Sequence, residues 1–214
     1  MIKSKFLAHR GIWDEDTSKN SKESLFKALS NKFGIETDIR DLNGSLVISH
    51  DPATKNNSFP VKDLFHFYNE IKSDSILALN IKSDGLQELL NQLLCVYNIP
   101  KANYFTFDMS IPDLNQYAKT NISRYTRLSD IENEPLLIDK CQGIWLDDFS
   151  GSLNTIDLAK EYLERTSVAF VSPELHGRQH ESTWHNIKDN KLHISENFLL
   201  CTDLPGAAYR FFKD

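Results

Sequence analysis

The chain has 214 residues, with 30 acidic against 24 basic side chains and a formal net charge of −6. This length suits one domain over residues 1–214, and the acidic balance excludes a nucleic-acid partner held by a broad basic surface. No apolar run reaches the roughly 18 residues of a transmembrane helix, and the N-terminus lacks the apolar core of a signal peptide. We therefore expect a cytoplasmic protein with no transmembrane segment.

Short apolar segments of strand type alternate with helix-like segments along nearly the whole chain. The predicted strands are residues 6–8, 34–39, 76–81, 104–107, 122–125, 143–146, 168–171 and 198–201. The predicted helices are residues 22–32, 61–72, 86–97, 112–119, 154–165, 181–189 and 205–212, and the connection 128–138 is poorly marked. Eight strands separated by helices favour a parallel α/β fold, a compact TIM (β/α)8 barrel, over an open sheet.

Residues suited to phosphate chemistry gather between positions 6 and 52. The first strand delivers His9-Arg10-Gly11, and a later apolar run, SLVIS, delivers His50. Glu36 and Asp38 lie two residues apart in a predicted strand, so they share one face. Two buried carboxylates that close repel each other unless they share a proton or a cation, and their oxygen atoms suit Mg²⁺ or Ca²⁺. A solvated strand face is the simpler alternative.

These segments resemble a known family. The resemblance rests on HRG, Asn20-Ser21, Ala28, GIETDIRD, Gly44 and VISHDP, in this order and spacing. Together they look like the N-terminal signature of the glycerophosphodiester phosphodiesterases, and LLCTDLP near the C-terminus is similar to the family's closing strand. The resemblance implies a TIM barrel, a divalent cation and a role in lipid metabolism. It makes His9 and His50 the catalytic acid/base pair, Glu36 and Asp38 metal ligands, and Arg10 a phosphate contact.

Further candidates follow other strands. Lys82 matches a phosphate-contacting lysine of the family, whereas Asn80 stands where the family commonly has a third acidic ligand. An amide oxygen still binds a hard cation but adds no charge. Asp147 or Asp148, after the sixth strand, could supply the missing charge.

The segment after the seventh strand departs from the Trp-containing motif expected in the family. Here Glu174 could be a metal ligand through water and His176 a substrate contact. For each of these two residues, an ordinary loop position with a solvated side chain is the alternative. The chain between His50 and the third strand, residues 51–75, must also hold a helix, so we expect little or no insertion there.

The predicted function is a metal-dependent phosphodiester hydrolase. It would cleave a small-molecule, glycerophosphodiester-like substrate to an alcohol and a phosphomonoester by acid–base catalysis with two histidines. One alternative is an enzyme resembling the phosphatidylinositol-specific phospholipases C, with another head group. The other is a non-catalytic barrel that binds a phosphorylated ligand.

Overall fold

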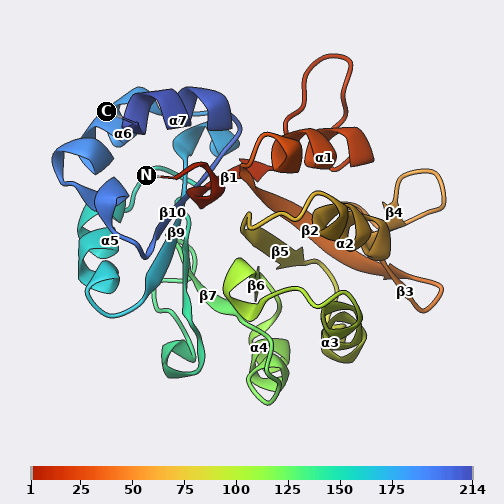
Figure 1. Ribbon diagram of the computed structural model, residues 1–214. Coiled ribbons are helices and arrows are strands. Elements are labelled where there is room, and N and C mark those ends of the chain that lie inside the picture. Colours follow the sequence, from red (N-terminus) through yellow and green to blue (C-terminus); the bar gives the residue numbers. More distant parts are fainter. Residues whose placement is uncertain (1, 214) are drawn as a thin grey trace.

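The computed structural model describes residues 2–213 of the chain. Within this range, ten strands form one continuous sheet, and seven α-helices accompany it (Figure 1). The strands are β1 (Phe6–His9), β2 (Gly34–Leu42), β3 (Ser45–Ile48), β4 (Phe59–Pro60), β5 (Leu77–Ile81), β6 (Tyr104–Phe107), β7 (Tyr125–Leu128), β8 (Gly143–Leu146), β9 (Ser167–Val171) and β10 (Phe198–Thr202). The helices are α1 (Lys22–Ser30), α2 (Val61–Glu70), α3 (Gln87–Val96), α4 (Ile111–Tyr117), α5 (Thr155–Leu163), α6 (Glu181–Asp189) and α7 (Pro205–Phe212).

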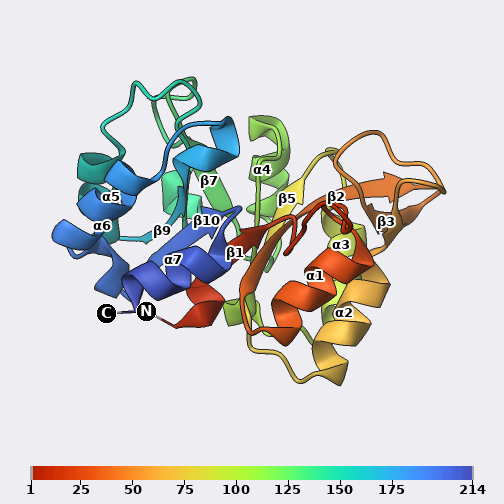
Figure 2. The same ribbon diagram turned by 90° about the horizontal axis from the view of Figure 1, so that it is seen from above.

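Eight of the strands are parallel and form a closed ring. Each pairs with the next in the order β1, β2, β5, β6, β7, β8, β9 and β10, and β10 pairs back with β1. Between β6 and β7 the ring is closed by an isolated parallel bridge from Thr106 to Arg124, the residue that precedes β7. The first half of the chain forms one side of the molecule and the second half the other (Figure 2). The predicted TIM barrel is therefore confirmed.

A small antiparallel ribbon lies beside the ring. β2 continues past the barrel and pairs with β3, from Leu42 opposite Ser45 to Ile39 opposite Ile48, and β4 pairs with β3 in turn. Helix α2 then leads back towards β5. The run that precedes His50 is thus a strand of this ribbon and not of the barrel.

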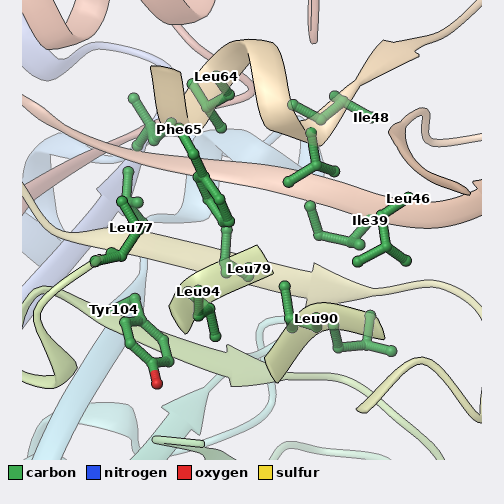
Figure 3. Packing of buried hydrophobic residues seen from close by; sticks show 14 of the residues in the cluster. Ile39, Leu46, Ile48, Leu64, Phe65, Leu77, Leu79, Leu90, Leu94 and Tyr104 are labelled. Atoms are coloured by element: carbon green, nitrogen blue, oxygen red, sulfur yellow. The ribbon is translucent and has the colours of Figure 1, made fainter. Parts of the chain in front are cut away.

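The outer face of the barrel is buried under the helices. Leu77 and Leu79 of β5 belong to one apolar cluster with Phe65 of α2 and with Leu90 and Leu94 of α3 (Figure 3). All five side chains are at most 4% exposed. Truncating one such side chain to alanine costs about 2–5 kcal/mol, so this packing fixes β5 and its neighbours.

The inner face carries aromatic side chains. Phe105 stacks on Tyr125 and Phe107 stacks on Trp145, each with ring centroids 3.9 Å apart. The four rings come from β6, β7 and β8 and are at most 7% exposed. These rings fill the middle of the barrel, so a site has to lie at one of its ends.

The fifth barrel strand lies three residues later than the sequence pattern predicts. Ile122 is fully buried, but it lies in the loop before β7. The Arg124 guanidinium holds this loop by donating hydrogen bonds to the carbonyl oxygen atoms of Ile122, Tyr117 and Lys140. Burial of Ile122 therefore mimics a strand signal. The poorly marked connection that follows contains a 3₁₀ helix, Ile138–Lys140, where other connections have an α-helix.

No helix in the described part of the chain combines the length and the apolar character that a bilayer span requires.

Candidate active site

A cavity of about 290 Å³ opens among the carboxyl ends of the barrel strands. It brings together most of the predicted site residues. Those that line it are His9, Arg10, Glu36, His50, Asn80, Lys82, Asp147 and His176. Asp38 is fully buried behind the lining. Such a position, at the carboxyl end of a parallel barrel, is where these folds place their functional groups.

The turn after β1 explains the glycine of the HRG motif. Arg10 has φ +57° and Gly11 has φ +90°, so the chain reverses sharply there. A Cβ atom on Gly11 would lie 2.5 Å from the carbonyl carbon of Ser24 in α1. Only glycine allows both this conformation and this approach. The turn aims Arg10 back towards β2, where its Nε lies 3.2 Å from Asp38 Oδ2.

His9 is held in one orientation by an acidic residue at the end of the last barrel strand. Its Nδ1 lies 2.7 Å from Asp203 Oδ1, and its Nε2 lies 3.9 Å from Glu36 Oε2. A hydrogen bond from Nδ1–H to Asp203 leaves Nε2 free to exchange a proton with a bound molecule. Burial lowers the pKa of His9, and the hydrogen bond to Asp203 opposes this effect.

The sequence prediction gave no role to Asp203. Leu199, Cys201 and Asp203 alternate along β10 and its end, so they share the inward face, and Leu199 and Cys201 belong to the interior cluster. This alternation, applied to LLCTDLP, could have placed Asp203 in the site. Its pairing with His9 needed the register between β1 and β10, in which Ala8 lies opposite Thr202.

Asp38 is the hub of the buried polar contacts. Its Oδ2 accepts a hydrogen bond from Asn20 Nδ2 at 2.7 Å and also faces Arg10. Lys82 Nζ lies 3.5 Å from Oδ1. The Thr37 hydroxyl donates to Asn20 Oδ1 at 2.8 Å and so fixes the amide orientation. Asn20, which carried part of the family resemblance, is thus a support for Asp38.

Among residues 2–213, three buried side-chain oxygen atoms on β2 and β5 are left without a hydrogen bond. They are Glu36 Oε2, Asp38 Oδ1 and Asn80 Oδ1. Glu36 and Asp38 are two residues apart on β2, and Asp38 lies opposite Asn80 in the register with β5. Burial, and secondarily the charge of Asp38, raises the pKa of Glu36 to about 8. Buried oxygen atoms without donors are costly unless a partner satisfies them.

This oxygen set fits a hard divalent cation, which would satisfy all three atoms at once. The set is two carboxylates and one amide. Within residues 2–213, no group of three or more His, Cys, Asp and Glu side chains is placed to hold a metal ion. If a cation binds here with protein ligands from both β2 and β5, we therefore expect Asn80 to be the ligand from β5.

The opposite side of the cavity contains an acid–histidine pair. His176 Nε2 lies 2.6 Å from Asp147 Oδ1, and this hydrogen bond raises the pKa of His176. The ring of Phe149 packs against His176 with centroids 4.9 Å apart. Asp148, the other acid considered at this strand end, accepts hydrogen bonds from the backbone of Gly151 and Ser152 and holds the loop. The structure thus places Asp147, not Asp148, in the cavity.

Glu174 is not brought into the cavity. Its two carboxylate oxygen atoms accept hydrogen bonds from the hydroxyls of Ser172 and Thr202, and Oε1 also accepts from the backbone N–H of Asp203 at 3.2 Å. With its oxygen atoms engaged in this way, Glu174 connects the ends of β9 and β10. We therefore read it as a support for the segment that carries Asp203.

His50 sits at the rim. Its side chain is 47% exposed, and its Nδ1 lies 2.9 Å from Asp51 Oδ1. Arg40 Nε donates a hydrogen bond to the His50 carbonyl oxygen at 3.0 Å, which fixes the backbone but leaves the ring accessible. The two predicted catalytic histidines therefore differ: His9 is largely covered and held, and His50 is exposed.

Two charged residues of the cavity lining were missed by sequence reasoning. Asp108 follows β6 and Arg127 lies in β7, and the two form an ion pair. Lys82 Nζ donates to the same Asp108 carboxylate at 3.2 Å. The predicted strand ended at Tyr125, so Arg127 fell just outside it. With β7 placed correctly, its alternation with Tyr125 puts it on the inward face.

Comparisons with known proteins identify solved structures of similar fold. No protein-family model matches the sequence, and no curated protein matches it either. A glycerophosphodiester phosphodiesterase from Parabacteroides distasonis superposes with a TM-score of 0.69 at 15% identity, over 97% of this chain and 96% of that chain. A protein from Galdieria sulphuraria, provisionally assigned as the same kind of enzyme, gives 0.75 at 15% identity, over 98% and 97%. A glycerophosphodiester phosphodiesterase from Agrobacterium tumefaciens gives 0.64 at 14% identity, over 97% of both chains.

These similarities span almost the whole of each chain, so the chain has the barrel fold found in glycerophosphodiester phosphodiesterases. The fold expected from the sequence resemblance is confirmed.

Proposed function

We propose that this chain is a phosphodiester hydrolase that depends on a divalent cation and acts on a glycerophosphodiester-like substrate. One observation supports this most: His9, held by Asp203, lines the same cavity as Glu36 and Asn80. Both of these residues have an unbonded oxygen atom, and so does Asp38, which is buried behind the lining. Arg10 and Lys82 line that cavity as well. An orientated imidazole, a cation-binding oxygen set and two cationic side chains are the groups that hydrolysis of a phosphate ester requires.

Glu36, Asp38 and Asn80 would hold the cation, either Mg²⁺ or Ca²⁺. When bound, the cation would neutralise charge on a non-bridging phosphate oxygen. The protein holds this part of the site rigid, because Asp38 is fixed by Arg10 and Asn20.

Arg10 and Lys82 bind the phosphate in this proposal. Both contact Asp38, so each is orientated before a substrate arrives. Cationic donors that are fixed in advance stabilise the charge that develops in the transition state without a cost of reorientation.

The two histidines move protons. His9 Nε2 takes the proton of the attacking hydroxyl, and Asp203 stabilises the imidazolium that forms. His50, exposed at the rim, gives a proton to the leaving alcohol oxygen. The P–O bond to that alcohol breaks as the new P–O bond forms, and the products are an alcohol and a phosphomonoester when water attacks.

The test is hydrolysis of bis(p-nitrophenyl) phosphate and of glycerophosphocholine in EDTA, Mg²⁺, Ca²⁺ or Mn²⁺. We expect turnover that EDTA abolishes and a divalent cation restores. Glu36→Gln should weaken binding of the cation, so that more of it is needed to restore turnover. Glu88→Gln, on the exposed face of α3, should behave as wild type. Folded protein that turns over neither substrate with any cation would contradict the proposal and favour a phosphate-binding barrel.

A further inference from the structure

Arg127 reaches the cavity from the side opposite β1 and β2. In β7 it lies two residues after Tyr125, whose ring stacks inside the barrel on Phe105. Side chains two residues apart in a strand share a face, so Arg127 continues the inward row of β7 above this aromatic layer. Its side chain is 31% exposed and lines the cavity together with Lys82 and Arg10.

The guanidinium group is held by two acids and keeps one nitrogen free. Nε pairs with Glu132 and Nη1 pairs with Asp108. Among residues 2–213, no hydrogen bond links Nη2 to another residue. A guanidinium fixed at two nitrogen atoms loses little conformational freedom when the third binds an oxyanion.

Asp108 couples this guanidinium to the phosphate side of the cavity. One carboxylate oxygen contacts Arg127, and the other accepts from Lys82 Nζ at 3.2 Å. Asp108 also has φ +72°, a conformation that aspartate adopts more readily than most residues. Lys82 in turn approaches Asp38, which faces Arg10. Acidic and basic groups thus alternate from β1 to β7 around one cavity.

We propose that Arg127 is a third phosphate-binding residue, whose Nη2 donates to a non-bridging phosphate oxygen, and that Asp108 is the positioning residue for both Arg127 and Lys82. The inference deepens the proposed function and rests on it for the identity of the anion. A phosphate group has oxygen atoms on several sides, so cations that approach from β1, β5 and β7 can bind it at the same time. Charge-assisted hydrogen bonds of this kind are the stronger ones in proteins.

The experiment is calorimetric titration with glycerol 3-phosphate and with inorganic phosphate, each in EDTA and in Mg²⁺. We expect Arg127→Gln to weaken binding of glycerol 3-phosphate by about 10- to 100-fold, the range for a lost hydrogen bond to a charged group. Arg127→Lys, which keeps the charge, should recover part of that loss. Arg165→Gln is the matched control, because it removes an arginine from an exposed pair with Glu161 on α5.

Asp108→Asn provides a second route that leaves Arg127 in place. It should weaken phosphate binding several-fold and raise KM more than it lowers kcat, because the side chains of Arg127 and Lys82 both lose a fixed partner. If Arg127→Gln does not fold, this variant decides the question. Equal effects of Arg127→Gln and Arg165→Gln, unchanged binding in both Arg127→Gln and Asp108→Asn, or no phosphate binding by the wild-type protein would overturn the inference.

The two proposals fail separately. If phosphate binding depends on Arg127 but the protein hydrolyses no diester, the role of Arg127 in binding stands and the proposed hydrolase activity is contradicted. If the protein hydrolyses diesters but Arg127→Gln changes neither phosphate binding nor KM, the hydrolase activity stands and the role of Arg127 is contradicted.

Discussion

The two sides of the cavity satisfy their charged groups differently. On β2 and β5, the oxygen atoms of Glu36, Asp38 and Asn80 include three that are buried and without a hydrogen bond. On the opposite side, Asp108 is paired with Arg127 and Asp147 with His176. The difference indicates a division of work: the first side has capacity left for a cation and for chemistry, and the second side is internally neutralised and suits binding and orientation.

The largest effect on turnover should come from the side of the cavity that contains His9, next to β2 and β5. We expect His9→Ala to lower kcat by about 10²–10⁴-fold, the usual contribution of a positioned acid or base, with little change in the thermal unfolding temperature. His66→Ala, an exposed histidine of α2, is the control. Turnover of bis(p-nitrophenyl) phosphate measures both. Near-normal kcat in His9→Ala would remove the assignment of chemistry to this side.

A smaller loss should follow from the support of His9. Asp203→Asn keeps the shape of the side chain but weakens control over the His9 tautomer, so we expect kcat to fall by about 10- to 100-fold, as when the partner of a metal-binding histidine is changed. KM should change little because Asp203 does not contact the phosphate in our proposal. A change confined to KM would instead place Asp203 among the binding groups.

Asn80 offers a way to sharpen the contrast between the two sides. Asn80→Asp adds a third carboxylate to the unbonded set, so we expect Mg²⁺ to bind about 10-fold more tightly, measured by calorimetry. Without a cation the same variant should unfold at a lower temperature, because like charges then lie buried together. Asn186→Asp, at an exposed position of α6, is the control. Unchanged Mg²⁺ affinity would exclude Asn80 from the cation site.

The smallest effect belongs to the neutralised side and depends on pH. The hydrogen bond to Asp147 raises the pKa of His176 above its ordinary value, so it stabilises the fold fully below about pH 6.5 and loses this effect as the pH rises through the raised pKa. In EDTA, the difference in free energy of unfolding between wild type and His176→Gln should therefore be larger at pH 5.5 than at pH 8.5. We expect less than about 1 kcal/mol because the ring is partly exposed.

Chemical denaturation at both pH values measures this difference, with His185→Gln, exposed on α6, as the control. A difference that grows towards high pH would contradict the assignment of a favourable His176–Asp147 pair.

The sequence was most informative where one short segment contains its own partners. Glu36 and Asp38 share a face by alternation alone, and the His9-Arg10-Gly11 motif follows directly from the first strand. The fold was also predictable, because eight strand-type runs alternate with helices. These inferences need only local periodicity.

The missed residues depend on contacts between distant segments. Asp203 meets His9 through the register of β10 with β1, and Asp108 meets Arg127 through the contact of β6 with β7. Glu174 shows the reverse case: it lies at a suitable strand end, but neighbouring hydroxyls occupy its oxygen atoms. Periodicity gives the face of a strand but neither its register nor the partners already taken.

The isolated bridge between β6 and β7 has a further consequence, for mechanical behaviour. All other neighbouring barrel strands pair over several residues, so this junction is the seam at which the ring can open with the fewest broken hydrogen bonds. Asp108 and Arg127 lie on either side of this junction, and their ion pair stabilises it. An anion bound between Lys82 and Arg127 would stabilise the junction further. Protection of the β6 and β7 amides from hydrogen exchange should therefore increase when the cavity is occupied.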